Sequence, residues 1–179
     1  MEAEATTPVR AILFDRDGTL IEDVPYNSDP AKVRAMKGAV SALRLVRHRG
    51  LSTGVVTNQS GVARGIFGKD DVDRINGRVE ALLGEFDVWE VCPHAPEDGC
   101  ECRKPAPGMI ISACRRLGIV TAEVAYIGDI GSDIEAAQSA GARSVLVPTP
   151  ATRIEEIEAA PLVAKDLLQA VTLVLGQAA

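Results

Sequence analysis

Two aspartates, one residue apart, follow a short apolar run near the start of the chain. The run Val9 to Phe14 leads directly into Asp15-Arg16-Asp17-Gly18-Thr19. A strand that ends in this motif would place two carboxylates at one edge of a sheet, beside a glycine that permits a sharp turn. Carboxylate oxygens suit a hard cation, and such a cation can hold a phosphate. The motif therefore predicts a chemical site.

Hydrolysis of a phosphate monoester needs a nucleophile, neutralisation of phosphoryl charge and a proton for the leaving oxygen. Asp15 is predicted to attack phosphorus and form an aspartyl-phosphate, which divides one difficult displacement into two easier steps. Asp17 is predicted to act first as general acid and then as general base. We expect Asp129 to bind Mg²⁺ together with Asp15 and the backbone carbonyl of Asp17.

Two later residues supply the donors and the positive charge that a phosphoryl group requires. The hydroxyl of Thr57 is predicted to donate to a phosphoryl oxygen, as are the amides from Asn58 onward. Lys104 is predicted to add a point cation, and Asp133 either to hold Lys104 or to support the metal site from behind. Each short motif alone is commonly a turn or a helix cap. Their joint occurrence in this order favours catalysis.

Alternating β-branched runs and helical patterns predict the elements that position these residues. We expect an α/β fold with a three-layer Rossmann-like parallel sheet, helices on both of its faces and no inserted second domain. Each polar motif follows a predicted strand, where ligands bind in such sheets. The strands are expected near Val9–Phe14, Leu51–Thr57, Val88–Cys92, Val124–Ile127 and Ser144–Val147.

Helices are predicted between these strands from apolar residues at helical spacing. Between Gly38 and Arg49 the expected core face carries Val40, Leu43 and Val46, with Gly50 beyond the end of the helix. Ser132 or Asp133 is expected to cap a later helix. The remaining helices are expected over Asp70–Leu83, from Pro107 through Leu117, and over Thr152–Ala160 and Lys165–Leu175.

Length and charge limit the class of protein. The 179 residues fit one domain, 1–179, with an ample core. A formal net charge of −6 disfavours nucleic acid as the main partner, since such binding depends on clustered Lys and Arg. We expect a monomer with a small phosphorylated molecule as substrate. Met1 to Glu4 lacks a basic start, and no run reaches the roughly 18 apolar residues of a membrane span, so a cytoplasmic protein with no membrane partner is expected.

Three cysteines and a histidine form a cluster in a loop at 92–102. Cys92, His94, Cys100 and Cys102 supply the donors of a closed Cys₃His zinc site, with no position left for water. The alternatives are a disulfide, disfavoured in a reducing compartment, and redox-sensing thiols. The zinc is therefore predicted to be structural and to order Arg103 and Lys104. Cys114 is expected in the core.

The motifs together resemble those of the haloacid dehalogenase-like superfamily of phosphatases. The resemblance rests on Asp15-Arg16-Asp17-Gly18-Thr19, Thr57, Lys104 and Gly128-Asp129-Ile130-Gly131-Ser132-Asp133. Two further runs resemble the zinc-containing branch with heptose bisphosphate and histidinol-phosphate phosphatases, and the match extends from Val9 to about Val147. These runs are Thr57-Asn58-Gln59-Ser60-Gly61-Val62-Ala63-Arg64-Gly65 and Cys92-Pro93-His94 with Cys100-Glu101-Cys102-Arg103-Lys104-Pro105-Ala106-Pro107-Gly108-Met109.

The resemblance implies an Mg²⁺-dependent phosphatase of small metabolites, with a minimal cap domain or none, and a set of substrate contacts. Arg103 would help to recognise the substrate, and we also favour a substrate role for Arg64 over that of a solvated loop residue. The residues implied to line the substrate are Asp23 to Tyr26 and Thr57, Asn58, Gln59 and Ser60.

The chain departs from the family pattern at three places that bear on specificity. Ile21 stands where the family often has Asn, Ile130 where a polar residue is frequent, and the stretch between His94 and Cys100 is short. A heptose bisphosphate that loses the phosphate far from the anomeric centre is the preferred substrate. Histidinol phosphate is the alternative within the same chemistry. The alternatives to this function are a catalytically silent, zinc-stabilised binding module and a polynucleotide end-phosphatase.

Overall fold

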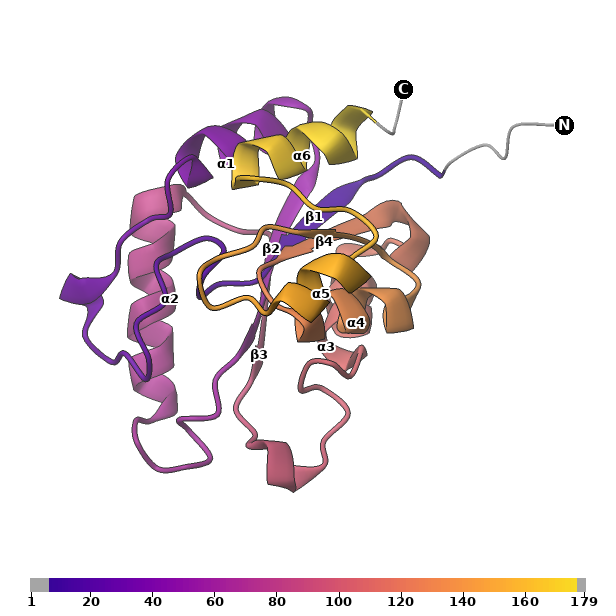
Figure 1. Cartoon of the computed structure of the whole chain (residues 1–179). Coiled ribbons are helices and arrows are strands. Elements are labelled where there is room, and N and C mark those ends of the chain that lie inside the picture. Colours follow the sequence, from indigo (N-terminus) through magenta and orange to yellow (C-terminus); the bar gives the residue numbers. More distant parts are fainter. Residues whose placement is uncertain (1–6, 177–179) are drawn as a thin grey trace, which may run out of the picture.

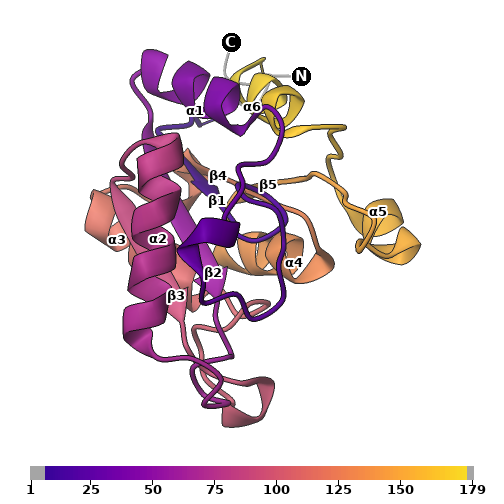
Figure 2. The same ribbon diagram turned by 90° about the vertical axis from the view of Figure 1, so that its left-hand side faces the viewer.

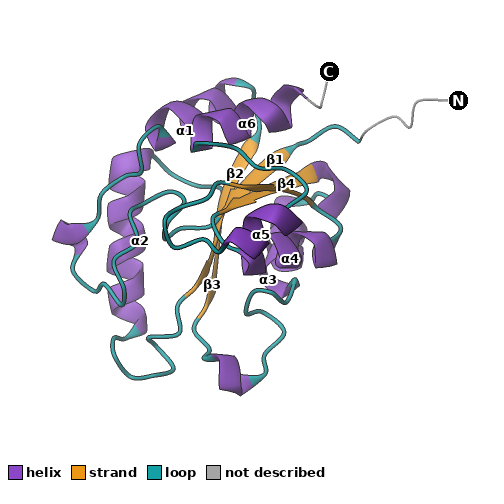
Figure 3. Ribbon diagram, in the orientation of Figure 1, coloured by secondary structure: helices purple, strands orange, loops and turns teal. Residues whose placement is uncertain are grey.

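A parallel sheet forms the centre of the molecule, in a computed structural model that describes residues 7–176 (Figures 1 and 3). Within these residues the sheet has five strands in the order β3-β2-β1-β4-β5, and every pairing is parallel. The predicted Rossmann-like α/β class is therefore confirmed. The strands are β1 (Ala11–Phe14), β2 (Ser52–Asn58), β3 (Val88–Cys92), β4 (Val124–Gly128) and β5 (Arg143–Leu146).

Helices cover both faces of this sheet and give the predicted three layers (Figure 2). One layer contains α1 (Ala39–His48), α2 (Lys69–Leu83) and α6 (Leu167–Gly176), and the other contains α3 (Gly108–Leu117) and α4 (Gly131–Ala140). A short helix, α5 (Ile154–Ala159), contacts the start of α4 through Glu156 and Gly131. Single 3₁₀ turns occur at Pro30–Lys32, Pro96–Asp98 and Thr121–Glu123.

The strands divide their side chains between two apolar cores. In β1, Ile12 and Phe14 pack toward α1, α2 and α6, whereas Ala11 and Leu13 pack toward α3 and α4. All four are fully buried. A strand buried on both faces reads as a continuous apolar run rather than an alternating one, which is the pattern that Val9 to Phe14 shows.

Two details of the helices differ from the sequence prediction. Val40 is 46% exposed, and the buried side of α1 consists of Ala39, Ala42, Leu43 and Val46. Val40 is rotated by about 100° from Ala39 and so falls outside the buried stripe. Helix α4 begins after Ile130, with neither Ser132 nor Asp133 at the N-cap position.

The topology brings distant loops to one edge of the sheet. Strand β1 pairs with β2 on one side and β4 on the other, so the loops after these three strands meet where the strand order reverses. Residues 1–6, which include the stretch Met1 to Glu4 considered above, and residues 177–179 lie outside the described part of the chain. In residues 7–176 we find no helix with the length and apolarity that a bilayer crossing would require.

The corrected face of α1 predicts a difference between two neighbouring truncations. Leu43→Ala removes a fully buried side chain, so the free energy of unfolding should fall by about 2–5 kcal/mol. Val40→Ala, on the exposed side, should change it by less than about 0.5 kcal/mol. Urea unfolding followed by circular dichroism measures both, and equal losses would show that α1 packs through a different face.

Candidate active site

The loop after β1 folds back sharply and carries the two aspartates. The amide of Asp15 still donates to the carbonyl of Ile127 on β4, at 2.9 Å, and a turn then begins at Arg16. Gly18 has φ of +83° in this turn, a conformation that glycine adopts without strain. A Cβ at Gly18 would also collide with the carboxylate of Asp129. Gly18 therefore allows the β1 and β4 loops to come into contact.

The ammonium of Lys104 lies at the centre of the site. Its Nζ is 2.7 Å from Oδ1 of Asp15 and 2.7 Å from Oδ1 of Asp133. The hydroxyl of Tyr126 at 2.9 Å and the carbonyl of Val56 at 3.1 Å complete its surroundings. Lys104 is 5% exposed and Asp133 is fully buried. A buried charge is tolerated only when it is paired, so this arrangement fixes the positions of both carboxylates.

Asp133 is held from both sides of its carboxylate. Its Oδ1 accepts from Lys104, and its Oδ2 accepts from the backbone amides of Asp129 and Ile130 at 3.1 and 3.2 Å. Asp133 thus caps α4 from inside its first turn. It also holds Lys104, which was one of the two tasks predicted for it.

Negative charge exceeds positive charge in this cluster. One oxygen from each of Asp15, Asp129 and Asp133 lies within 4.8 Å of the others, around the single ammonium of Lys104. Burial raises the pKa of Asp15 well above its usual value against the opposing effect of Lys104, and it raises the pKa of Asp129 to about 7. Burial alone would lower the pKa of Lys104, but Asp133 and Asp15 raise it. The single ammonium of Lys104 therefore cannot neutralise all three carboxylates.

The donor set suits a divalent cation. The oxygens of Asp133 are occupied by Lys104 and the two amides, whereas Asp129 accepts at Oδ1 from Thr19 at 3.3 Å. Asp15 and Asp129 thus have oxygen positions to offer to a metal ion. Hard, partly desolvated carboxylates of this kind are what Mg²⁺ prefers, so the residues present fit the predicted ion.

Asp17 faces a different set of partners from Asp15. Its carboxylate accepts from Arg16, with Nε to Oδ1 at 3.2 Å and Nη2 to Oδ2 at 3.0 Å, and from Nε2 of Gln59 at 2.8 Å. Its side chain lies outside the cluster of Asp15, Asp129 and Asp133. The predicted metal ligand of Asp17 therefore stays its backbone carbonyl and not its carboxylate.

The residues after β2 connect the phosphate side of the site to Lys104. Thr57 is 1% exposed, and its Oγ1 accepts from Nε2 of Gln59 at 2.9 Å. Asn58 donates from Nδ2 to the carbonyl of Lys104 at 3.2 Å and accepts at Oδ1 from the amide of Lys104 at 3.1 Å. This two-bond contact fixes the Lys104 backbone to the end of β2, a role that the sequence did not indicate.

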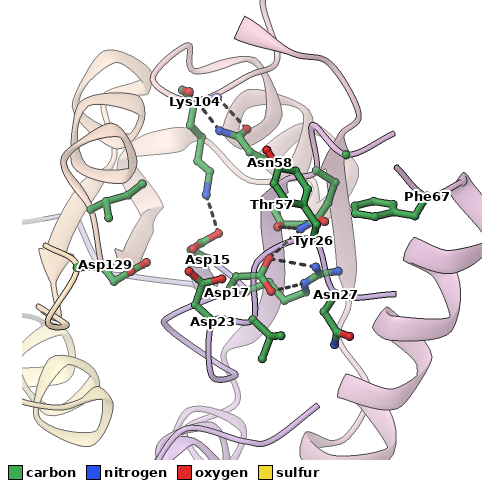
Figure 4. Close-up of a pocket in the computed structure, with 16 residues that line it drawn as sticks. Asp15, Asp17, Asp23, Tyr26, Asn27, Thr57, Asn58, Phe67, Lys104 and Asp129 are labelled. Atoms are coloured by element: carbon green, nitrogen blue, oxygen red, sulfur yellow. Dashed lines mark hydrogen bonds and ion pairs between the residues drawn. The ribbon is translucent and has the colours of Figure 1, made fainter. Parts of the chain in front are cut away.

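A polar cavity of about 250 Å³ opens over these groups (Figure 4). Its size suits a phosphoryl group with part of a small metabolite. Most of the predicted residues line it, and Figure 4 shows them converging from separate loops. The predicted residues on its wall are Asp15, Asp17, Asp23, Tyr26, Thr57, Asn58, Gln59, Lys104 and Asp129.

Three predicted substrate contacts, Ser60, Arg64 and Arg103, are not among the residues that line this cavity. Arg64 is exposed, and the guanidinium of Arg103 donates to the carbonyl of His94 at 3.2 Å. The sequence missed other wall residues. Phe67 could have been suspected as a loop aromatic in an aromatic-poor chain, but Asn27 and Ala151 carried no signal. Val24, within the predicted range Asp23 to Tyr26, also lines the cavity, and the remaining lining residues are Arg16, Gly61 and Ile130.

The two isoleucines that depart from the family pattern lie in different environments. Ile130 is 37% exposed and lines the cavity, so it can affect which substrate fits. Ile21 is 3% exposed and packs in the core on the α1 side of the sheet. The departure from the family pattern at Ile21 therefore affects core packing. Of the two isoleucines, only Ile130 is placed to change a substrate contact.

The four cysteine and histidine donors converge beyond the end of β3. The Sγ of Cys92 lies 3.7 Å from that of Cys100 and 3.2 Å from that of Cys102, and Nδ1 of His94 lies 3.5 and 3.2 Å from Cys92 and Cys102. In a tetrahedral site with Zn–S of about 2.3 Å the sulfurs are about 3.8 Å apart. The donor set thus fits zinc. Cys114 is buried in the core, as predicted.

Known proteins resemble this chain over most of its length. A sequence profile described as HAD-hydrolase-like matches residues 101–170. A protein of Pseudomonas putida named D-glycero-beta-D-manno-heptose-1,7-bisphosphate 7-phosphatase is 35% identical over 151 residues, covering 79% of this chain and 83% of its own. A protein of the same name from Bordetella bronchiseptica is 35% identical over 146 residues, covering 79% and 82%.

Solved structures give the same result. The B. bronchiseptica D,D-heptose 1,7-bisphosphate phosphatase, complexed with magnesium and phosphate, superposes with a TM-score of 0.83 at 30% identity, over 94% of this chain and 99% of that one. A HAD-like phosphatase of Mesorhizobium loti has a TM-score of 0.75 at 30% identity, over 99% and 91%.

The chain belongs to the haloacid dehalogenase-like family of phosphatases. It is accordingly an enzyme, a phosphoric monoester hydrolase. Both predictions from the sequence are confirmed, and the alternative of a catalytically silent binding module is set aside.

The close approach of Gly18 to Asp129 predicts that alanine substitutions at Gly18 and at Gly118 will both lower stability, but that only the one at Gly18 will lower activity. Gly118→Ala, at φ of +67° with open space around it, should cost about 1–2 kcal/mol of unfolding free energy and leave turnover unchanged. Gly18→Ala shares the strained φ but also displaces the Asp129 carboxylate, so phosphatase activity should fall at least tenfold more than in Gly118→Ala. Urea denaturation and phosphate release measure the two effects. Full activity in Gly18→Ala would contradict the contact.

Proposed function

We propose that this chain is an Mg²⁺-dependent phosphatase that removes the 7-phosphate of a heptose 1,7-bisphosphate through an aspartyl-phosphate on Asp15. The observation that carries the proposal is the buried carboxylate of Asp15, 2.7 Å from the ammonium of Lys104 and grouped with Asp129. Relatives with this name, 35% identical over most of the chain, support the choice of substrate. The enzyme would act in carbohydrate metabolism.

In the proposed first step, an oxygen of Asp15 forms a bond to phosphorus while the bond to the sugar oxygen breaks. Asp17 gives its proton to that leaving oxygen. Lys104 holds the orientation of Asp15, and Thr57 and the backbone amides after it donate to the phosphoryl oxygens as their charge redistributes.

In the second step, water attacks the phosphorus of the aspartyl-phosphate and gives a proton to the carboxylate of Asp17. The bond between phosphorus and Asp15 then breaks, which regenerates the free carboxylate. Asp15, Asp129 and the Asp17 carbonyl would hold Mg²⁺, which supplies the positive charge that the carboxylate cluster lacks. The magnesium and phosphate bound by the B. bronchiseptica enzyme support this assignment.

Several expectations from the sequence stay predictions. They are substrate contacts of Ser60, Arg64 and Arg103, the single domain 1–179, the monomeric state and the cytoplasmic location. The proposed substrate contact of Arg103 is supported by its position directly before Lys104 in the chain.

The proposal predicts a defined pattern of phosphate release. With Mg²⁺ present, heptose 1,7-bisphosphate should be hydrolysed faster than histidinol phosphate or a 3′-phosphorylated oligonucleotide, and only the 7-phosphate should be lost. Asp15→Asn should reduce turnover to background, and Asp17→Asn should lower it about 10²–10⁴-fold on sugar phosphates. Asp73→Asn, an exposed carboxylate on α2, is the matched control and should retain wild-type turnover.

Each outcome of that screen has a distinct meaning. A flat profile over all substrates would overturn the heptose assignment and leave the reaction class in place. Undiminished turnover in Asp15→Asn would overturn the aspartyl-phosphate mechanism. A steep fall of turnover with salt would instead indicate a nucleic-acid substrate.

We also propose that Cys92, His94, Cys100 and Cys102 hold a structural zinc ion that orders the loop before Lys104. The amide of Arg103 donates to Sγ of Cys100 at 3.4 Å, which links the cluster directly to the residue before Lys104. With four protein donors the site is closed to substrate. The residues of the loop would then hold Lys104 in line with Asp15.

The zinc proposal predicts that the metal and the activity are lost together. Cys100→Ser should abolish stoichiometric zinc, measured by elemental analysis, and lower both the melting temperature and kcat. Cys114→Ala removes a buried thiol outside the cluster, so it should keep the zinc while costing some stability. The ordering role is wrong if Cys100→Ser loses zinc and keeps wild-type kinetics and melting temperature.

A further inference from the structure

Arg16, the residue between the two aspartates, is a buried cation with no task in the mechanism above. It is 3% exposed, although arginine is among the residues least often buried. A buried guanidinium is costly unless its donors are satisfied. The partners of Arg16 therefore show what its burial serves.

The guanidinium of Arg16 forms a two-pronged contact with the carboxylate of Asp17. Its Nε donates to Oδ1 at 3.2 Å and its Nη2 donates to Oδ2 at 3.0 Å. Such a planar fork fixes both the position and the rotation of a carboxylate, which a point charge does not. The turn after β1 makes the contact possible, because Leu20 and Ile21 both donate their amides to the carbonyl of Arg16.

The other end of the guanidinium is anchored on α2. Its Nη1 donates to Oδ1 of Asn76 at 2.8 Å, across 60 positions of sequence. Asn76 lies beside the buried residues Ile75 and Val79 of the same helix, so it is attached to the apolar core. Through Arg16, the orientation of the Asp17 carboxylate is thereby fixed to helix α2 and not only to its own loop.

These contacts leave Asp17 one free acceptor position. A carboxylate offers about four lone-pair sites, two on each oxygen. Arg16 takes one on each oxygen, and Gln59 takes the second site on Oδ2 at 2.8 Å. The remaining site is on Oδ1. The side chain of Asp17 is 28% exposed, so this atom can reach a ligand in the cavity.

We propose that Arg16 is the positioning residue of Asp17: anchored on Asn76, it fixes the carboxylate so that Oδ1 carries the proton exchanged with the leaving oxygen and then with water. In the first step the proton passes from Oδ1 to the oxygen released from phosphorus, and in the second it returns from the attacking water. This inference rests on the proposed function in one respect, the proton-transfer role of Asp17.

The dependence on the leaving group tests this role. An alkyl phosphate needs a proton at its leaving oxygen, whereas p-nitrophenyl phosphate releases a stable anion and needs little help. Arg16→Met should lower the single-turnover rate of leaving-group release about 10²-fold on a sugar phosphate and less than fivefold on p-nitrophenyl phosphate, because only this first step depends on the leaving group. The substrate concentration that half-saturates this step should change less than threefold on both. A loss of folded protein would lower both activities equally, so the fold of the variant is checked by circular dichroism. Equal losses in a folded Arg16→Met overturn the proposal.

A double-mutant cycle separates failure of the inference from failure of the proposed function. If Asp17→Asn shows the same asymmetry and the double variant loses nothing more, Arg16 acts through Asp17. If Asp17→Asn shows no asymmetry, the proton-transfer role is wrong, and this inference falls with it. A raised KM in Arg16→Met, with losses that add to those of Asp17→Asn, would mean that Arg16 binds substrate and would overturn the positioning role alone.

Two milder variants keep the test valid if Arg16→Met fails to fold. Arg16→Lys keeps the charge but not the fork, so it should retain the asymmetric loss, and wild-type kinetics in Arg16→Lys would overturn the fork. Asn76→Leu removes the anchor and should lower the single-turnover rate of leaving-group release at least threefold more on the sugar phosphate than on p-nitrophenyl phosphate, and equal effects would overturn the anchor. Arg78→Met, on the exposed side of α2, is the matched control and should leave both activities unchanged.

Discussion

The buried ammonium of Lys104 is the charge on which the rest of the site depends. It lies 2.7 Å from both Asp15 and Asp133, and each of these carboxylates is in turn fixed to a different strand end or helix. Without this cation, three carboxylates would be buried close together at a high electrostatic cost. The two-bond contact of Asn58 holds the Lys104 backbone. Under the zinc proposal the cysteine loop would hold it from the other side, so much of the surrounding structure would serve its placement.

Much of this arrangement could be predicted because it depends on local pattern. Continuous apolar runs between helical segments indicate a parallel sheet covered on both faces, and parallel strands bring their carboxyl ends to one edge. That rule alone places Asp15, Thr57, Lys104 and Asp129 near one another. The convergence of Cys92, His94, Cys100 and Cys102 could likewise be predicted, because these donors are close in the chain.

What could not be predicted depends on contacts between distant segments. No rule of spacing pairs Arg16 with Asn76, or brings Ala151 to the cavity wall, since both results follow from how α2 and the chain after β5 pack. Val40 was misplaced for a related reason. Valine and alanine both fit an apolar helix face, and the small alanines of α1, which pattern analysis weighs lightly, define the side that approaches the sheet.

The residues of the site are far apart in the sequence, which affects when the site can form during synthesis and folding. Asp15 is made early in synthesis, whereas its partner Lys104 follows 89 positions later and Asp133 later still. Contacts of such long range close late and slow the folding of a domain. A ribosome-bound nascent chain therefore exposes the carboxylate of Asp15 without its cation. Asp129 and Asp133 follow β4 in the chain, so the charge cluster around Lys104 is complete only after β4 has paired with β1.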